Sequence, residues 1–264
     1  MKIGVFDSGL GGLTVVKALS QVIQNAQLFY VADTHNAPYG EKTPQEILTY
    51  SLDITKYLIE NYQIDALVLA CNTATSFAIK HLREQYPNLI IIGTEPGVKP
   101  AIKHTKTGKI GVLATPATLK GDKYQDLVSQ ISKEKDVTLF EQACPGLVEH
   151  IERGQSSSEA CKALLENWLK PMREQEVDTI VLGCTHYPLV GSEIVEIMAC
   201  EVMLIDTGLA IANRLLALGL NQGHENEGDF EISVQSTGEI NQNLVEEILE
   251  MPVAVQSLDL IKGQ

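Results

Sequence analysis

The chain has 264 residues, 44% of them hydrophobic, and a net charge of −14, so it is long enough for one large α/β unit or for two lobes that each bury a core. The acidic balance argues against nucleic acid or anionic membrane as the main partner, because both are bound by clustered Lys and Arg. The longest apolar runs are too short to span a bilayer, and the first residues lack the apolar segment of a signal peptide, so we expect a cytoplasmic protein without membrane contact.

Short apolar runs alternate with helical stretches along the first third of the chain. The expected strands cover 2–7, 27–33, 64–70 and 88–94, and the expected helices cover 13–23, about 43–62 and 75–86. Strands that alternate with helices are typical of parallel βαβ units. We therefore expect the chain to begin with a parallel sheet.

The pattern then starts again. KIGV occurs at 2–5 and again at 109–112. VDTIVLGCTHYP at 177–188 matches IDALVLACNTAT at 64–75 in its hydrophobic positions and in its cysteine. The offsets of the two matches, 107 and 113 residues, are similar, so we expect two related lobes rather than a coincidence of short matches.

The last part of the chain has to return to the first lobe. The second lobe is expected to end with a strand at 201–206, and the helices and strand after it need a sheet to join. We predict an α/β fold of two similar lobes, residues 1–95 with 207–264 and residues 96–206, each a mostly parallel sheet flanked by helices and related by a pseudo-twofold duplication. The cleft between two such lobes is the expected place for a small-molecule active site.

The residues that follow the strands are polar. Ligands of open α/β sheets bind beyond the carboxyl ends of the strands. The segments expected there are Asp7–Ser8, Asp33–Gly40, Cys71–Thr73, Thr115–Thr118 and Cys184–His186. Their hydroxyl and amide groups suit a small, polar ligand that carries carboxylates.

The segment DSGLGG permits a dinucleotide interpretation. Gly9 and Gly11 fit the first part of the fingerprint, but Thr14 stands where its third glycine is needed, and Asp33 ends the second strand where a ribose-binding acid would lie. The alternative is a tight turn into a helix N-terminus, which glycines serve equally well. A nucleotide-dependent oxidoreductase therefore remains an alternative function, ranked third.

Five cysteines occur, widely spaced and without a CxxC pair. We expect reduced thiols and no metal site. Cys161 is expected in a helix core and Cys200 at a buried helix end. Cys144 is expected to be structural, although Glu149 and Glu152 follow it.

The other two cysteines occupy the same slot of the repeat. Cys71 precedes an expected helix that Asn72 or Thr73 can cap, and Cys184 precedes one that Thr185 can cap. The positive end of a helix lowers the pKa of a thiol, and at the ordinary pKa near 8.5 only about 3% of a thiol is ionised at pH 7. The alternative, an inert core cysteine, leaves the matched positions unexplained.

Two thiols from two facing lobes would approach one ligand from opposite sides. Inversion of a carbon centre requires this arrangement, because a base removes a proton from one face and an acid delivers a proton to the other. His186, two residues after Cys184, can reach that thiol or its ligand.

Four motifs together carry a family resemblance. DSGxGG, PYG, ACNTA and GCTHYP, in this order and at these spacings, resemble the cofactor-independent glutamate racemases of the aspartate/glutamate racemase superfamily, over essentially the whole chain. The resemblance implies interconversion of L- and D-glutamate without pyridoxal phosphate, metal or nucleotide. It also implies a supply of D-glutamate for peptidoglycan, and it leaves a homodimer open, because dimers are common in the family.

The resemblance assigns roles to individual residues. Cys71 looks like the thiol that serves one enantiomer and Cys184 like the thiol that serves the other. Asp7 resembles the acid that assists Cys71, and His186 with Glu152 resembles the pair that assists Cys184. Glu152 is chosen over Glu149 because the family's acid stands eight residues after the cysteine of its CP segment. The substrate-holding positions are Asp7, Ser8, Tyr39, Gly40, Asn72, Thr73, Thr118, Thr185 and His186.

Two positions depart from the family pattern. Asn36 stands where many members have Arg, and Glu149 stands where a proline is common. These departures bear on fine specificity and not on the type of reaction. The alternatives are an aspartate racemase and a non-catalytic, two-lobed binding protein for small acids.

Overall fold

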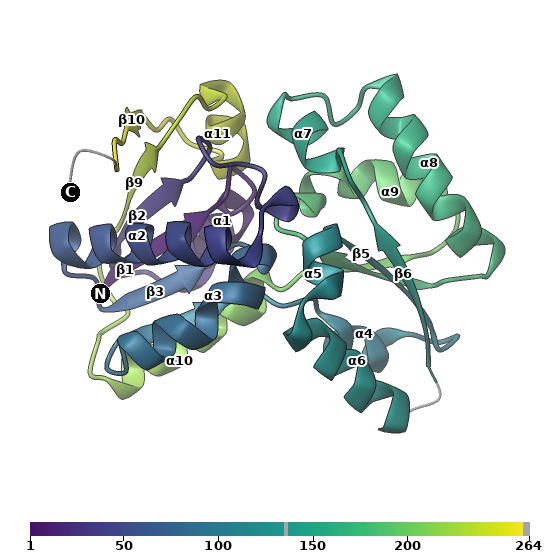
Figure 1. Cartoon of the computed structure of the whole chain (residues 1–264), viewed down its shortest axis with the longest axis horizontal. Coiled ribbons are helices and arrows are strands. Elements are labelled where there is room, and N and C mark those ends of the chain that lie inside the picture. Colours follow the sequence, from purple (N-terminus) through teal and green to yellow (C-terminus); the bar gives the residue numbers. More distant parts are fainter. Residues whose placement is uncertain (135–136, 261–264) are drawn as a thin grey trace. The chain divides into compact units, whose positions relative to one another are not determined.

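The computed structural model describes residues 1–134 and 137–260. The chain forms two compact units: unit 1 is Met1–Thr94 together with the segment from Thr207 onward, and unit 2 is Glu95–Asp206. None of the helices described is both long and apolar enough to cross a bilayer. Each unit is an α/β structure with its own sheet (Figure 1).

Unit 1 is built on a six-stranded sheet in the order β10-β9-β2-β1-β3-β4, in which every pair is parallel. Its elements are β1 (Lys2–Asp7), α1 (Leu13–Val22), β2 (Ala26–Ala32), the 3-10 helix η1 (Tyr39–Glu41), α2 (Pro44–Tyr62), β3 (Ala66–Leu69), α3 (Asn72–Gln85), β4 (Ile90–Gly93), α10 (Gly208–Asn221), β9 (Phe230–Ser236), α11 (Gln242–Leu249) and β10 (Val255–Ser257). Helix α2 packs against α3, and α1 packs against α10 and α11. The central strands are buried along almost their whole length, as expected for a parallel sheet with helices on both faces.

The start of α2 shows how local sequence fixes an element. Thr43 caps the helix, and Oε2 of Glu46 accepts a hydrogen bond from the Thr43 backbone N–H at 2.9 Å, while Pro44 occupies the first helical position. This capping box with proline is a strong helix-start signal. The loop that contains Tyr39 and Gly40 ends at this cap.

Unit 2 has a four-stranded parallel sheet in the order β6-β5-β7-β8. Its elements are α4 (Val98–His104), β5 (Lys109–Ala114), α5 (Pro116–Lys120), α6 (Asp122–Glu134), β6 (Thr138–Ala143), α7 (Leu147–Glu152), α8 (Glu159–Glu174), β7 (Thr179–Gly183), the 3-10 helix η2 (Tyr187–Val190), α9 (Gly191–Met198) and β8 (Met203–Ile205). Val112 of β5 packs in one core cluster with residues of α4 and α6. A Cβ added at Gly111 would lie 2.7 Å from the sulfur of Met172 in α8, so this glycine lets α8 approach the sheet closely.

The two sheets share one topology. The order β2-β1-β3-β4 in unit 1 corresponds to β6-β5-β7-β8 in unit 2. Phe6 pairs with Leu69, and the residues 107 and 113 positions later, Leu113 and Leu182, pair with each other in the same register. The predicted fold of two similar parallel α/β lobes is confirmed.

Two strands were missed at the sequence level. β6 is a half-exposed edge strand, and β10 has only three residues, so neither shows the continuous apolar run that marks a buried strand. β10 extends unit 1 beyond β9, which itself lies alongside β2 (Figure 1).

Candidate active site

The carboxylate of Asp7 is held at the carboxyl end of β1 by the glycine-rich turn that follows it. Asp7 is fully buried, and its Oδ2 accepts a hydrogen bond from the backbone N–H of Gly12 at 2.7 Å. A Cβ at Gly12 would lie 2.7 Å from the Cβ of Asp7, so only glycine permits this approach. The Tyr30 hydroxyl fastens the same turn by donating to the Gly9 carbonyl at 2.6 Å. The glycine-rich turn therefore fixes the position of the Asp7 carboxylate.

Cys71 is itself the cap of helix α3. Its sulfur accepts a hydrogen bond from the backbone N–H of Ala74 at 3.4 Å. The prediction that Asn72 or Thr73 caps this helix is wrong, because both lie inside its first turn. Backbone N–H groups at a helix start stabilise negative charge, so this position favours a thiolate.

Ser8 links the thiol to the acid. The Cys71 sulfur lies 3.9 Å from the Ser8 hydroxyl oxygen, which lies 3.5 Å from Oδ1 of Asp7. All three side chains are buried. The structure thus brings together a thiol, a hydroxyl and a carboxylate at the carboxyl ends of β1 and β3.

The loop after β2 is organised around Asp33. Tyr39 donates its hydroxyl proton to Oδ2 of Asp33 at 2.6 Å, and burial, reinforced by the Asp33 charge, raises the pKa of Tyr39 well above its ordinary value. Asn36 donates to both carboxylate oxygens at 3.1 Å, and Thr237 donates to Oδ1 at 2.7 Å. Each oxygen has two donors, so the buried carboxylate offers nothing to a ribose. The dinucleotide interpretation of Asp33 is wrong.

Unit 2 supplies a second thiol with different partners. The Cys184 sulfur lies 3.7 Å from Nδ1 of His186, and Nε2 of His186 lies 2.6 Å from Oε1 of Glu152. Burial lowers the pKa of His186, but the hydrogen bonds to Cys184 and Glu152 outweigh it, and the pKa is raised well above its ordinary value. The imidazole of His186 therefore bridges the Glu152 carboxylate and the Cys184 sulfur.

The helix predicted to begin directly after Cys184 with Thr185 as its cap begins elsewhere. The four-residue helix η2 begins at Tyr187 with His186 at its cap position and without a side-chain cap, and α9 begins only at Gly191. Thr185, predicted as the cap, lies in the turn before η2. After Cys184 the backbone turns instead of continuing into a long helix. His186 therefore follows Cys184 at the position where, in unit 1, helix α3 begins after Cys71.

Thr118 lies in the short helix α5, after the carboxyl end of β5. Thr115 caps this helix, accepts a hydrogen bond from the Thr118 N–H at 3.1 Å and donates to the Thr118 hydroxyl at 2.9 Å. Thr115 occupies the position that corresponds to Ser8 in the repeat, whereas Ala114 corresponds to Asp7. The two thiols are equivalent by position, but their acidic partners are not.

The remaining cysteines do not join this chemistry. Cys144 is buried after β6, and burial raises its pKa to about 12, so it stays a thiol at neutral pH. Cys161 is fully buried in α8, as expected. The prediction for Cys200 is wrong: this thiol is exposed, because α9 ends at Met198 and Ala199 turns into a left-handed conformation.

Tyr187 is a buried neighbour of Cys184 that the sequence patterns did not single out. Burial, and then the proximity of Cys184 and Cys144, raises its pKa well above its ordinary value. The THYP motif contains it, but only the fold shows that it lies beside both sulfurs.

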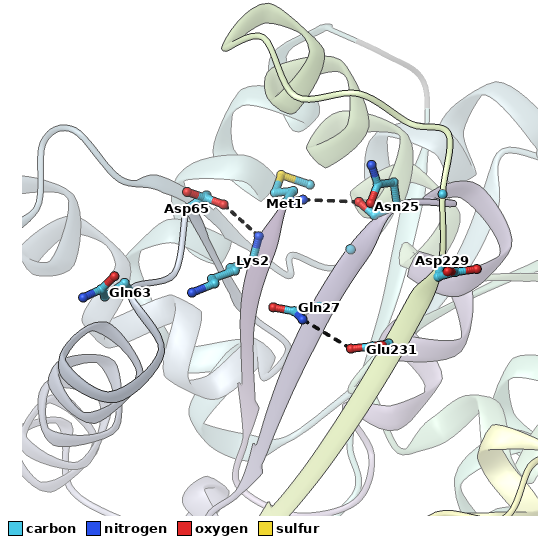
Figure 2. Close-up of a pocket in the computed structure, with 10 residues that line it drawn as sticks. Met1, Lys2, Asn25, Gln27, Gln63, Asp65, Asp229 and Glu231 are labelled. Atoms are coloured by element: carbon cyan, nitrogen blue, oxygen red, sulfur yellow. Dashed lines mark hydrogen bonds between the residues drawn. The ribbon is translucent and has the colours of Figure 1, made fainter.

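A cavity of about 720 Å³ lies elsewhere in unit 1, at the amino ends of β1, β2 and β9 (Figure 2). The backbone N–H of Lys2 donates to Asp65 at 2.7 Å, and Gln27 donates to Glu231 at 3.3 Å. Its lining contains none of the predicted site residues. It opens at the end of the sheet opposite to Cys71. Over the described parts of the chain, no cluster of three or more His, Cys, Asp and Glu side chains could hold a metal ion.

Comparisons with known proteins agree with this geometry. The Asp/Glu/Hydantoin racemase family matches residues 3–215. A glutamate racemase of Sulfurovum sp. (strain NBC37-1) is 63% identical over 249 residues, which cover 94% of each chain. A solved glutamate racemase isoform of Bacillus anthracis has a TM-score of 0.87 at 29% identity, covering 98% of this chain and 97% of that chain. Another, from Francisella tularensis subsp. tularensis SCHU S4 in complex with D-glutamate, has a TM-score of 0.84 at 26% identity, covering 99% and 98%. The chain belongs to the Asp/Glu/Hydantoin racemase family.

Proposed function

We propose that this chain is a glutamate racemase that interconverts L- and D-glutamate by two-base proton transfer at the α-carbon. The observation that carries the proposal is the pair of buried thiols, Cys71 and Cys184, at equivalent positions of two repeated units. Each thiol has its own charged neighbours, Asp7 on one side and His186 with Glu152 on the other. Two such thiols would provide an acid and a base for proton transfer in both directions.

In each direction one sulfur acts as base and the other as acid. The thiolate forms an S–H bond as the Cα–H bond of glutamate breaks, and the electron pair moves into the adjacent carboxylate. The opposite thiol then gives its proton to the other face of the α-carbon and is left as a thiolate. Proton transfer by positioned groups accelerates such steps by about 10²- to 10⁴-fold. The enzyme ends in the protonation state that starts the reverse reaction.

The two thiolates are stabilised by different means. On Cys71 the N–H groups of α3 would support the negative charge, and Ser8 and Asp7 would relay a proton, which their distances to the sulfur and to each other support. On Cys184 the charge is supported by His186, whose own positive charge is held by Glu152.

The substrate is proposed to be held by hydroxyl, amide and backbone groups near the two sulfurs. These are Ser8, the Tyr39–Gly40 segment, Asn72, Thr73, Thr118 and Thr185, together with Asp7 and His186. The solved Francisella relative was obtained in complex with D-glutamate, which supports a dicarboxylate of this size. The proposed chemistry is carried by side chains alone, without pyridoxal phosphate, metal or nucleotide.

The test is exchange of the α-proton in deuterated water. Purified protein without added cofactor is incubated with L- or D-glutamate, and loss of the α-proton signal is followed by NMR together with optical rotation. We expect exchange and racemisation from both enantiomers. If neither enantiomer exchanges, the proposal is wrong, and calorimetric binding of glutamate without turnover would favour a binding protein instead.

An aspartate racemase is the second candidate, because the matched family includes racemases of both amino acids by its description. Comparing kcat/KM for glutamate and aspartate decides between them, and we expect glutamate to be preferred. A higher kcat/KM for aspartate would overturn that choice.

We also propose a cellular role. The enzyme would supply D-glutamate for peptidoglycan from the cytoplasm, as a monomer or a homodimer. Depletion of the protein should then be rescued by external D-glutamate. Cell fractionation would test the location, and light scattering of the purified protein would test the oligomeric state.

A further inference from the structure

We propose that Asp33 is a positioning residue for racemisation: its buried carboxylate holds Tyr39, and with it the Tyr39–Gly40 segment, in the place where substrate binds. The inference rests on the proposed function, because it takes that segment to contact glutamate. Asp33 itself does not touch the substrate. It acts through the loop that it organises.

Asp33 is placed beside the catalytic acid by the sheet. It directly follows β2, and its backbone N–H donates to the carbonyl of Asp7 at 2.9 Å. Its side chain is fully buried. A buried carboxylate is costly unless hydrogen bonds satisfy its oxygens, and here four hydrogen bonds do so. Such a group fixes the geometry of its donors.

Tyr39 is the donor that reaches toward the thiol. Its ring is almost fully buried and lies in the same core cluster as Cys71 and Ala74. The 2.6 Å hydrogen bond from its hydroxyl to Asp33 is short, as expected when a neutral donor meets a charged acceptor. Because the only hydroxyl proton of Tyr39 points at Asp33, the orientation of the ring is set by that carboxylate.

Thr237 anchors the same carboxylate from a distant part of the chain. Its hydroxyl donates to Oδ1 of Asp33 at 2.7 Å and accepts from the N–H of His35 at 3.1 Å. Its backbone N–H donates to the carbonyl of Ala32 at 3.0 Å. The end of β9 and the start of the loop are therefore joined on both sides of Asp33.

The contact of Thr237 with Asp33 suggests a role for β9, the strand of unit 1 that has no counterpart in the described sheet of unit 2. In unit 1, β9 pairs with β2, whereas in unit 2 the equivalent strand β6 forms the edge of the described sheet. The Thr34 and Ser236 hydroxyls add a further hydrogen bond at 2.7 Å between loop and strand. The C-terminal segment thus supports the substrate loop of unit 1.

Replacing Asp33 with Asn isolates the charge from the shape. The amide keeps the volume of the side chain, but its NH₂ group turns a donor toward a donor, so either Tyr39 or Thr237 loses its acceptor. We expect KM for both enantiomers to rise about tenfold, because the loss of a hydrogen bond to a charged group destabilises the loop conformation that binds substrate by about that factor. We expect kcat to change less than KM.

Asp178 offers a matched control. Its two oxygens accept four hydrogen bonds, from Thr105, Lys106, Thr107 and Thr179, just before β7 in unit 2. Asp178→Asn removes a carboxylate that also accepts four hydrogen bonds, at the end of β7 opposite to Cys184. Thermal unfolding should show a loss of stability in both variants, but only Asp33→Asn should raise KM.

The experiment measures kcat, KM and calorimetric Kd for glutamate in the wild type, Asp33→Asn, Tyr39→Phe, the double variant and Asp178→Asn. We expect the Asp33 and Tyr39 changes to be non-additive, the double variant being little worse than either single one. Thr237→Val, which keeps the charge, should raise KM in the same direction by a smaller factor and stands in if Asp33→Asn does not fold.

Each result has a defined meaning. If the wild type racemises glutamate and neither Asp33→Asn nor Thr237→Val raises KM beyond Asp178→Asn, the inference is overturned while the proposed function stands. If the wild type binds glutamate without turnover, the proposed function fails and the Kd values still test Asp33. If it neither binds nor turns over glutamate, both are overturned.

Discussion

Removing the carboxylate of Glu152 tests how the second thiol is controlled. Glu152→Gln keeps the size of the side chain and a hydrogen-bonding group, but it removes the negative charge 2.6 Å from Nε2 of His186. The pKa of His186 is raised by its bonds to Cys184 and Glu152 against the effect of burial. Without the Glu152 charge the imidazolium is less stable, so the pKa of His186 falls.

The size of the effect follows from this contact. A hydrogen bond between charged groups contributes about 1.5–3 kcal/mol, and the partial exposure of Glu152 favours the lower end of this range. At about 1.4 kcal/mol per pKa unit, the pKa of His186 should fall by about one unit.

The assay is the pH profile of kcat/KM, which reports groups of the free enzyme. L- and D-glutamate have equal free energies in solution, so kcat/KM is the same in both directions and either enantiomer can be used. We expect the alkaline limb of Glu152→Gln to move about one unit to lower pH. Glu149→Gln, on the same short helix α7, should leave the limb in place. An unmoved limb in Glu152→Gln would refute the role of this pair.

Three further predictions concern His186, Gly12 and Cys144. The raised pKa of His186 stabilises the fold fully below the unfolded value near 6.5, and this stability is lost as the pH rises through the folded pKa. His186→Asn should therefore flatten the pH dependence of the unfolding free energy above about pH 6.5, measured by urea denaturation. Gly12→Ala should displace Asp7, costing about 1–3 kcal/mol of stability and at least tenfold in kcat; normal turnover would contradict the turn's role. Cys144→Ala should retain turnover, because a thiol with a pKa of about 12 is not a base at neutral pH; loss of activity in a folded variant would contradict this.

The repeated sheets could be predicted because their signal is local and occurs twice. KIGV and VLxC are buried central strands, β1 with β3 and β5 with β7, and their apolar runs are visible without coordinates. The matching register follows from the nearly equal offsets. The edge strand β6 could not be predicted in the same way, because none of its residues is buried and its sequence, TLFEQA, lacks a continuous apolar run.

The detail of the site depends on contacts that the sequence does not display. Asn and Thr are better helix caps than Cys by propensity, yet the backbone enters α3 so that the Cys71 sulfur takes that place. Asp33 could be interpreted as a ligand-binding acid because its partner Thr237 lies 204 residues away. The burial of Cys200 was mispredicted because α9 stops two residues before it. These three features depend on tertiary contacts and not on local sequence.

The central claim is that two thiols serve opposite faces of one substrate, and single-thiol variants test it most directly. In deuterated water, Cys71→Ala and Cys184→Ala should both lose racemisation, since each lacks the acid or base for one face. Each variant should still exchange the α-proton of one enantiomer with retention of configuration, and the two variants should act on opposite enantiomers. Racemisation by either variant, or exchange of the same enantiomer by both, would contradict the account.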